Sequence, residues 1–271
     1  MKRIRKLCII FIMCILSMLL GSCGNEQVEN PDAETESNAE KKVPQSMIER
    51  GKTEDGVTYE YNKENATLTM SGKIIKGAYP DNYSKDIDGV PEERPWEKWR
   101  DEVKEIVLEE GVESVTNMAF TNFRNVEKIV FPKTLKKIGM YAFYGSTREI
   151  RKLVLPDSVE EIGWCAFAKD YCYNGIEEIK LPKNLRNIGE SAFSAQSFKN
   201  FMIPENVESI DKEVFEECNY LETVIIKSKK IKKVQEPIFK RKNVTVYVPK
   251  DKVKEYKKWL REAKEVLPIE K

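Results

Sequence analysis

Few residue types in this chain could carry out chemistry. The 271 residues include no histidine, which excludes Ser-His-Asp and Cys-His catalysis and every histidine-ligated metal site. The sequence also lacks a phosphate-binding glycine loop, a GxSxG elbow and a CxxC pair. We therefore predict no catalytic residue, no metal site and no cofactor.

The cysteines add few candidates for chemistry. Cys8 and Cys14 lie in an apolar N-terminal run and Cys23 follows it, which leaves Cys165, Cys172 and Cys218. An odd number of remaining thiols cannot form a complete disulfide framework. Two interpretations stay open, a disulfide between Cys165 and Cys172 or buried free thiols.

Residues 1–22 are typical of a bacterial secretory signal. Four basic residues precede a fourteen-residue apolar run from Leu7 to Leu20, and this run is too short to span a bilayer, which takes about 20 residues. The run ends in Leu20-Gly21-Ser22-Cys23, which resembles a bacterial lipobox. The resemblance implies cleavage before Cys23 and lipidation of its thiol. An ordinary cleaved signal with a chance cysteine is the alternative.

The next segment, residues 23–50, reads as an acidic disordered tether, because it is polar and almost free of large apolar side chains. The predicted location is the bacterial cell surface, with the folded part outside the cytoplasm and anchored to a membrane through Cys23. Without residues 1–22 the chain has 42 basic and 45 acidic residues, a balance that argues against nucleic-acid binding.

A repeat dominates residues 103–243. Six units, 22 to 26 residues apart, begin with an apolar residue at Val103, Val126, Ile150, Ile176, Phe198 and Leu221. The apolar residues three and five positions later predict a short strand with inward side chains, which a proline then ends. A glycine precedes an Ala-Phe pair, and we expect Gly139, Gly163 and Gly189 to adopt a positive φ there. The recurring phenylalanines should form the core: Phe120, Phe143, Phe167, Phe193, Phe215 and Phe239.

The pattern Leu-x-x-Ile-x-Leu-Pro-x-x-Leu-x-x-Ile-Gly-x-x-Ala-Phe resembles the BspA-like (Treponema-type) leucine-rich repeat, over roughly residues 57–260. The resemblance implies a repeat solenoid, with a β-strand and a short helix or turn in each repeat. It also implies a surface lipoprotein that adheres or attaches to host or neighbouring-cell proteins.

Caps are predicted at both ends of the repeats. Residues 51–102 should form an N-terminal cap, with a β-hairpin around residues 62–66 and a short helix from Pro95 whose tryptophans cover the first coil. Residues 244–271 should form the last strand and a helix from Asp251. One apolar face marks that helix, followed by Pro268: Val253, Tyr256, Leu260, Ala263 and Leu267.

A binding surface is predicted on the outer face of the strands, four positions after each unit start. This candidate stripe comprises Val107, Val130, Val154, Lys180, Met202, Ile225 and, in the last strand, Tyr247. Two interpretations stay open, a stripe that binds a partner and cross-strand packing without a ligand. Two positions earlier, Glu105 with Lys128 and Lys152 with Glu178 should form cross-strand ion pairs that flank the stripe.

Two further candidates lie outside the strands. The longest loop carries Tyr171 and Tyr173, which could contact a partner; a merely tolerated insertion is the alternative. Residues 227–264 contain 15 basic and four acidic residues, a bias that suits polyanions; a solvated face is the alternative. The candidate polyanion contacts are Lys229, Lys230, Lys232, Lys233, Lys240, Arg241 and Lys242.

The sequence therefore predicts a monomeric, membrane-anchored and non-catalytic leucine-rich-repeat protein that binds an extracellular or host protein. The alternative is a glycan- or wall-polymer-binding accessory lipoprotein that uses its basic C-terminal end.

Overall fold

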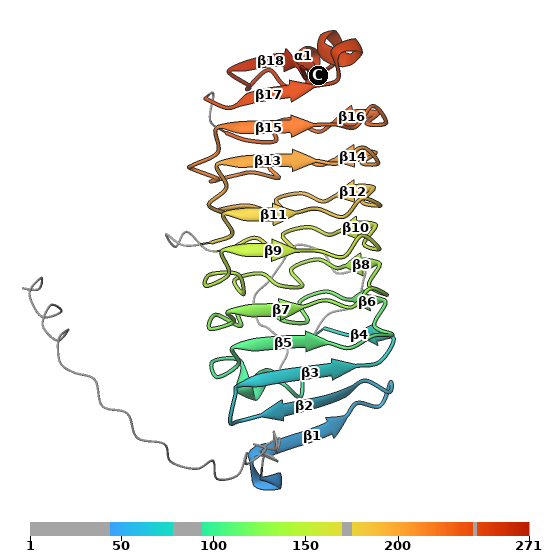
Figure 1. The fold of residues 1–271 in the computed structure, drawn as a ribbon, viewed down its shortest axis with the longest axis vertical. Helices are drawn as coiled ribbons and strands as arrows, with labels where there is room; N and C mark the ends of the chain where they lie inside the picture. Colours follow the sequence, from blue (N-terminus) through green and yellow to red (C-terminus); the bar gives the residue numbers. More distant parts are fainter. Residues whose placement is uncertain (1–43, 78–93, 170–174, 241–242, 271) are drawn as a thin grey trace, which may run out of the picture. The chain divides into compact units, whose positions relative to one another are not determined.

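The computed structural model of the protein describes residues 44–77, 94–169, 175–240 and 243–270. Residues 43–271 form one compact unit. This unit is a β-solenoid of about seven leucine-rich-repeat turns stacked on one another, with little helix (Figure 1). The predicted signal, Cys23 and residues 23–43 of the predicted tether lie outside the described residues.

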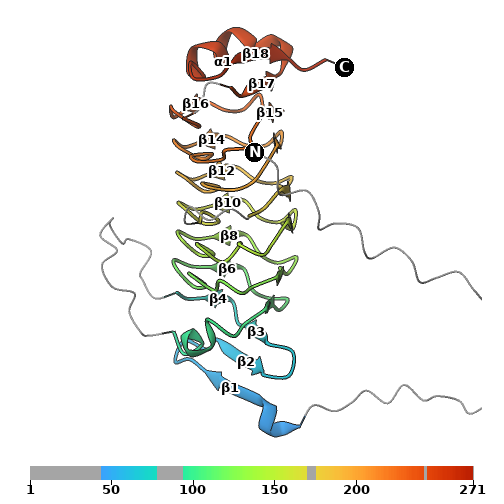
Figure 2. The same cartoon turned by 90° about the vertical axis from the view of Figure 1, so that its left-hand side faces the viewer.

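Parallel strands form two columns along the stack, which Figure 2 shows from the side. The first column contains β3 (Thr67–Ser71), β5 (Glu105–Leu108), β7 (Lys128–Val130), β9 (Lys152–Val154), β11 (Glu178–Lys180), β13 (Asn200–Ile203), β15 (Thr223–Ile226) and β17 (Thr245–Val248). The second contains β4 (Ile74–Ile75), β6 (Ser114–Val115), β8 (Lys137–Ile138), β10 (Glu161–Ile162), β12 (Asn187–Ile188), β14 (Ser209–Ile210) and β16 (Lys233–Val234). The second column is one continuous sheet, whereas the first is divided after β7 and again after β11.

The strands of the first column form where the sequence predicts them, because alternate side chains can be buried between the two columns. The sequence predicted one strand in each repeat, so the strands of the second column are additional. Ile106 and Leu108 of β5 are buried, while Glu105 and Val107 face outward. The repeat length keeps successive strands in register, so that Ile106 lies beside Ile129. One unit cannot bury its own apolar side, but stacked units bury a continuous core.

The phenylalanines form the predicted spine of this core. The ring centroids of Phe143 and Phe167 are 5.5 Å apart with an interplanar angle of 3°, and those of Phe167 and Phe193 are 5.9 Å apart at 2°. Further along the stack, Phe201 from the neighbouring strand lies between Phe193 and Phe215, at 5.3 and 4.6 Å. The three central rings of the spine are fully buried, which confirms the packing predicted from the repeat.

The prediction of a positive φ at the repeat glycines is wrong. The left-handed residues are found two positions later, at Tyr141 (φ 54°), Cys165 (φ 50°) and Ser191 (φ 53°). The glycines are needed because neighbouring coils approach too closely for a side chain. A Cβ atom on Gly163 would lie 2.7 Å from the carbonyl carbon of Gly139, and one on Gly189 equally close to that of Gly163.

The N-terminal cap contains two strands more than predicted, β1 and β4. β1 (Ile48–Lys52) follows a 3-10 turn over Gln45–Met47 and pairs antiparallel with β2 (Thr58–Asn62), which forms the predicted hairpin with β3. The tether predicted over 23–50 therefore extends too far, since its last three residues belong to β1. Gly51 of β1 leaves room for Tyr59, whose hydroxyl oxygen would lie 2.0 Å from a Cβ atom there.

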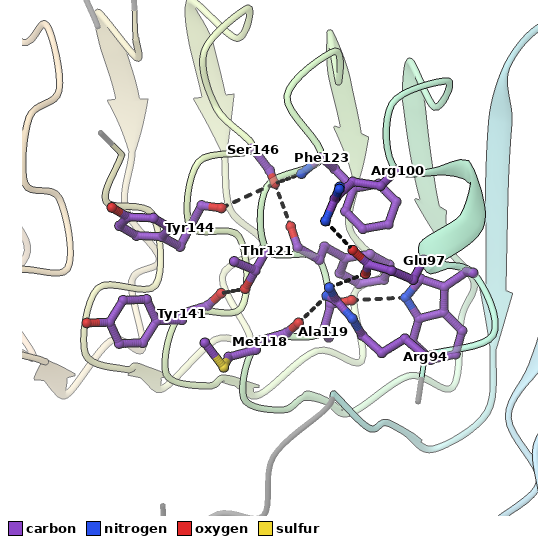
Figure 3. A network of polar contacts seen from close by, with 12 residues as sticks. Arg94, Glu97, Arg100, Met118, Ala119, Thr121, Phe123, Tyr141, Tyr144 and Ser146 are labelled. Atoms are coloured by element: carbon purple, nitrogen blue, oxygen red, sulfur yellow. Dashed lines mark hydrogen bonds and ion pairs between the residues drawn. The ribbon is translucent and has the colours of Figure 1, made fainter. Parts of the chain in front are cut away.

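The predicted tryptophan helix is a single 3-10 turn over Glu97–Trp99. Trp96 and Trp99 are buried against the first coils, and the Trp96 indole donates a hydrogen bond to the Ala119 carbonyl at 2.9 Å. Figure 3 shows this bond within a polar network, in which the buried Arg94 donates to the Met118 carbonyl and pairs with Glu97. The side chain of Ser146 joins the next coils, donating to the Phe120 carbonyl at 2.5 Å. The first coil is thus covered by both apolar and polar contacts.

The C-terminal cap differs from the prediction. A 3-10 turn over Lys250–Lys252 leads into α1 (Val253–Trp259), and residues beyond it form a further strand, β18 (Glu265–Pro268), instead of continuing the helix. β18 lies parallel to β17, with Val266 beside Val246 and Leu267 beside Tyr247. Leu267, predicted on the helix face, is therefore in the sheet. A strand forms here instead of a longer helix because Val266 completes the core of the last coil, where it is 5% exposed.

Candidate interaction surface

The predicted stripe follows the outer face of the first strand column. Its most exposed apolar members are Val154 and Met202, with 52% and 48% of their surface exposed. Val107, Val130, Ile225 and Tyr247 are half-buried, and Lys180 is exposed. All seven predicted residues thus reach the surface on one face of the solenoid.

The structure groups these residues into three segments, because the strand column is divided. Val107 pairs in register with Val130, and Val154 with Lys180. The third segment is longer and entirely apolar, with Met202 beside Ile225, Ile225 beside Tyr247, and Tyr247 beside Leu267. We call these last four residues the C-terminal apolar patch. Leu267 was missed by the sequence analysis, because its spacing also fits a helix.

The predicted cross-strand ion pairs flank the stripe. Lys128 Nζ lies 2.6 Å from Glu105 Oε1, and Lys152 Nζ lies 3.0 Å from Glu178 Oε2. Immediately before the strands, a further set of pairs joins neighbouring coils: Lys104 with Glu127, Arg151 with Glu177 and Lys199 with Glu222. Each pair is exposed and contributes little to stability, but together they neutralise most of the charge beside the stripe.

Charge also alternates along the second strand column. Lys136 pairs with Glu113 at 3.4 Å, and Arg186 pairs with Glu160 at 3.8 Å and with Glu208 at 2.9 Å. Many basic side chains on and beside both columns therefore have carboxylates as immediate neighbours.

A shallow polar depression lies over β12, β14 and β16, lined by Asn187, Glu208, Ser209, Asp211, Lys232 and Gln235. Its side chains bond mainly to one another, with Ser209 donating to Asn187 at 2.9 Å and Gln235 to Asp211 at 2.6 Å. Partial burial raises the pKa of the Asp211 carboxyl above its usual value. Four of the six lining side chains thus bond to one another, and Glu208 pairs with Arg186.

Three of the seven sequence-predicted polyanion contacts are engaged within the chain. Lys229 pairs with Asp251 at 2.9 Å, Lys230 donates to Asn206 at 2.6 Å, and Lys240 pairs with Glu216. Lys232 is exposed in the depression, and Lys233 lies in β16. Arg241 and Lys242 lie outside the described residues, as do the loop candidates Tyr171 and Tyr173.

The remaining thiols are poorly suited to chemistry. Cys165 and Cys218 are free and buried, and burial raises the pKa of each to about 12. A thiol with so high a pKa holds its proton at neutral pH and is a weak nucleophile. Cys172 lies outside the described residues.

Within the described residues, no group of three or more Cys, Asp or Glu side chains is placed to hold a metal ion. In the same part of the chain, no helix has the length and apolar character needed to cross a membrane.

The stacked coils, paired strand columns and aromatic spine define a leucine-rich-repeat solenoid, a class of protein that generally serves as a non-catalytic binding scaffold. Residues 98–174 and 146–260 match the model of the BspA type leucine rich repeat region, which holds six copies. The chain belongs to this family. No curated protein sequence matches it.

Solved structures of similar fold come from several bacteria. A leucine-rich repeat protein from Eubacterium ventriosum is 17% identical, with a TM-score of 0.50, over 78% of this chain and 66% of that one. The pneumococcal vaccine antigen PcpA is 21% identical, with a TM-score of 0.42, over 80% and 47%. A leucine rich cell surface protein from Faecalibacterium prausnitzii is 15% identical, with a TM-score of 0.39, over 81% and 72%. The chain thus spans about two thirds of the first of these proteins and half of the second.

Proposed function

We propose that the protein is a cell-surface scaffold that binds an extracellular or host protein through the outer face of its first strand column. The C-terminal apolar patch is the observation that carries this proposal. Four apolar side chains lie in register there on an outward face, with Met202 48% exposed. Contiguous apolar surface of this kind often marks an interaction site.

The rigidity of the solenoid supports the same role. Paired strands hold the patch in place, so that binding would cost little ordering entropy. The neutralised charge beside the stripe leaves apolar contact as the main attraction, whereas the flanking pairs can select among partners.

The test is binding of the full chain to a panel of immobilised extracellular-matrix proteins, measured by biolayer interferometry. We expect a Met202→Gln/Ile225→Gln variant to bind its partner at least tenfold more weakly, because losing two apolar contacts costs about 1.5 kcal/mol or more. The matched control is Ile74→Gln, which changes a 40% exposed residue of the second column. An equal loss in both variants would contradict the proposal.

We also propose that the scaffold is anchored through a lipidated Cys23, which the acidic tether links to the repeats. The lipobox-like Leu20-Gly21-Ser22-Cys23 supports this. Cells fed a labelled fatty acid should label the protein, and a Cys23→Ser variant should lose the label while Cys172→Ser retains it. Label that persists in Cys23→Ser would contradict the anchor.

A further inference from the structure

Uncompensated basic charge is concentrated on the outer face of the C-terminal cap. Five side chains of this segment are exposed, namely Lys250, Lys254, Lys257, Lys258 and Arg261. Their spacing of three or four residues places those of α1 on one side of the helix. We call these five residues the cap basic face.

None of the three α1 lysines in this face makes an ion pair within the described residues, in contrast with the strand columns, where carboxylates alternate with the lysines. The three carboxylates nearest to α1 in the sequence have other partners. Asp251 pairs with Lys229, and Glu255 pairs with Lys252. Glu262 accepts a hydrogen bond from the Ile238 amide at 2.9 Å.

Helix stability does not account for this arrangement. Like charges three and four residues apart, such as Lys254 with Lys257 and Lys258, destabilise a helix. The helix dipole favours cations only in the last turn, which could explain Lys257 and Lys258 but not Lys250 and Lys254. The cap basic face therefore carries a cost that a bound anion would remove.

We propose that the cap basic face binds a polyanionic glycan, meaning a polysaccharide chain with regularly spaced sulfate or phosphate groups. The three α1 lysines extend over roughly 6 Å of helix length, at about 1.5 Å per residue, and Lys250 and Arg261 extend the face beyond the two ends of the helix. A linear polymer with several charges fits such a row better than a single small anion does.

The packing of α1 argues against a membrane surface as the partner. Its apolar side chains face the solenoid, where Tyr256 and Leu260 are buried and Val253 and Trp259 pack on the core. The Tyr256 hydroxyl donates to the Ser228 carbonyl at 3.1 Å. No apolar side is left to enter a bilayer, as an interfacial helix requires. With both aromatic rings turned inward, there is likewise no platform for stacking nucleic-acid bases.

This site is independent of the C-terminal apolar patch and differs from the lysines predicted from the sequence. Those lysines were predicted because they are dense along the chain. In the structure, three of them already form ion pairs or a hydrogen bond, with Asp251, Asn206 and Glu216. The structure instead indicates the three lysines of α1, which form no ion pair within the described residues.

The test uses the full chain, purified in detergent, and heparin as the polyanionic probe. A Lys254→Gln/Lys257→Gln/Lys258→Gln variant should bind heparin at least tenfold more weakly and elute from a heparin column at lower salt. The slope of log K against log salt should fall by about 2, by analogy with counterion release from other polyanions. Because the three side chains are exposed and on the outer face, the variant should retain the thermal stability of the parent.

The matched control is Lys104→Gln/Lys128→Gln/Lys152→Gln, which removes the same charge from lysines that are ion-paired on the strand column. It should bind heparin nearly as well as the parent. Equal weakening in both triple variants would show a net-charge effect and overturn the proposal, as would undiminished binding in the cap variant.

Binding to phosphatidylglycerol vesicles but not to heparin would also overturn the proposal, since the partner would then be a lipid surface. Met202→Gln/Ile225→Gln should leave heparin binding unchanged, which separates this site from the proposed protein-binding surface.

Discussion

At the scale of single residues, the repeat glycines illustrate what a sequence pattern leaves undetermined. Glycine is required both where φ is positive and where two backbones approach closely. The repeat pattern indicated that glycine is required at Gly139, Gly163 and Gly189. Periodicity alone does not distinguish a positive φ from a close approach of two backbones. In the structure the left-handed residues are Tyr141, Cys165 and Ser191, and the glycines allow neighbouring coils to stack.

We expect Gly163→Ala to destabilise the solenoid by about 2 kcal/mol or more, because overpacking of a tight core typically costs 1–3 kcal/mol. The new Cβ atom would meet backbone atoms of Gly139 and Met140 at 2.7 and 2.8 Å, and backbone cannot turn away as a side chain can. The measurement is the midpoint of urea-induced unfolding.

The matched control is Asp211→Ala at the corresponding position of a later coil. A Cβ atom is already present there, so we expect a change below about 1 kcal/mol, the size of the lost hydrogen bond from Gln235. If Gly163→Ala were as mild as the control, close stacking would not be the reason for the glycine.

At the scale of the elements, the first-column strands, the hairpin and the last strand were predictable, whereas β1, β18 and the second strand column were not. Alternation repeated in six units located the strands of the first column. β1 and β18 occur once each, so repetition adds no support to their short patterns. The helical spacing that predicted α1 continued through Leu267, but residues 265–268 form β18 because Val266 pairs with Val246.

β18 protects the edge of the sheet that β17 would otherwise expose. It is short and contains an outward Glu265 and a proline at its end, features that discourage further strand pairing. We expect a chain ending at Lys264 to self-associate, because the backbone groups of β17 and the side chain of Val246 become accessible. The measurement is light scattering over a range of protein concentrations.

A chain ending at Ile269 keeps β18 and serves as the control, since the Ile269 amide still donates to the Val248 carbonyl. It should remain monomeric over the same concentrations. A chain ending at Lys264 that also stayed monomeric would show that β18 is not needed to block association.

At the scale of the whole molecule, both the fold and its functional surfaces follow from stacking. The repeat predicts which side chains point outward, and in this way the stripe from Val107 to Tyr247 and the flanking ion pairs were found. The sequence could not show where that stripe divides or that Leu267 extends it, since these depend on pairing between coils. The cap basic face was missed for a related reason. Which lysines lack a carboxylate depends on side chains brought together from distant coils.

Each coil contacts mainly its two neighbours. A destabilising substitution should therefore lower the stability of the adjacent coils more than that of distant ones. Phe167 lies between Phe143 and Phe193 at 5.5 and 5.9 Å, and Phe167→Ala should cost about 3–5 kcal/mol through the cavity that it leaves. We expect amide hydrogen exchange to accelerate most in the coils on both sides of residue 167. Phe239→Ala should instead accelerate exchange mainly in the C-terminal coils, and Tyr220→Ala, which changes a 60% exposed side chain, should have little effect anywhere. Equal acceleration throughout residues 44–270 in both phenylalanine variants would contradict this expectation, because it would mean that all coils unfold together.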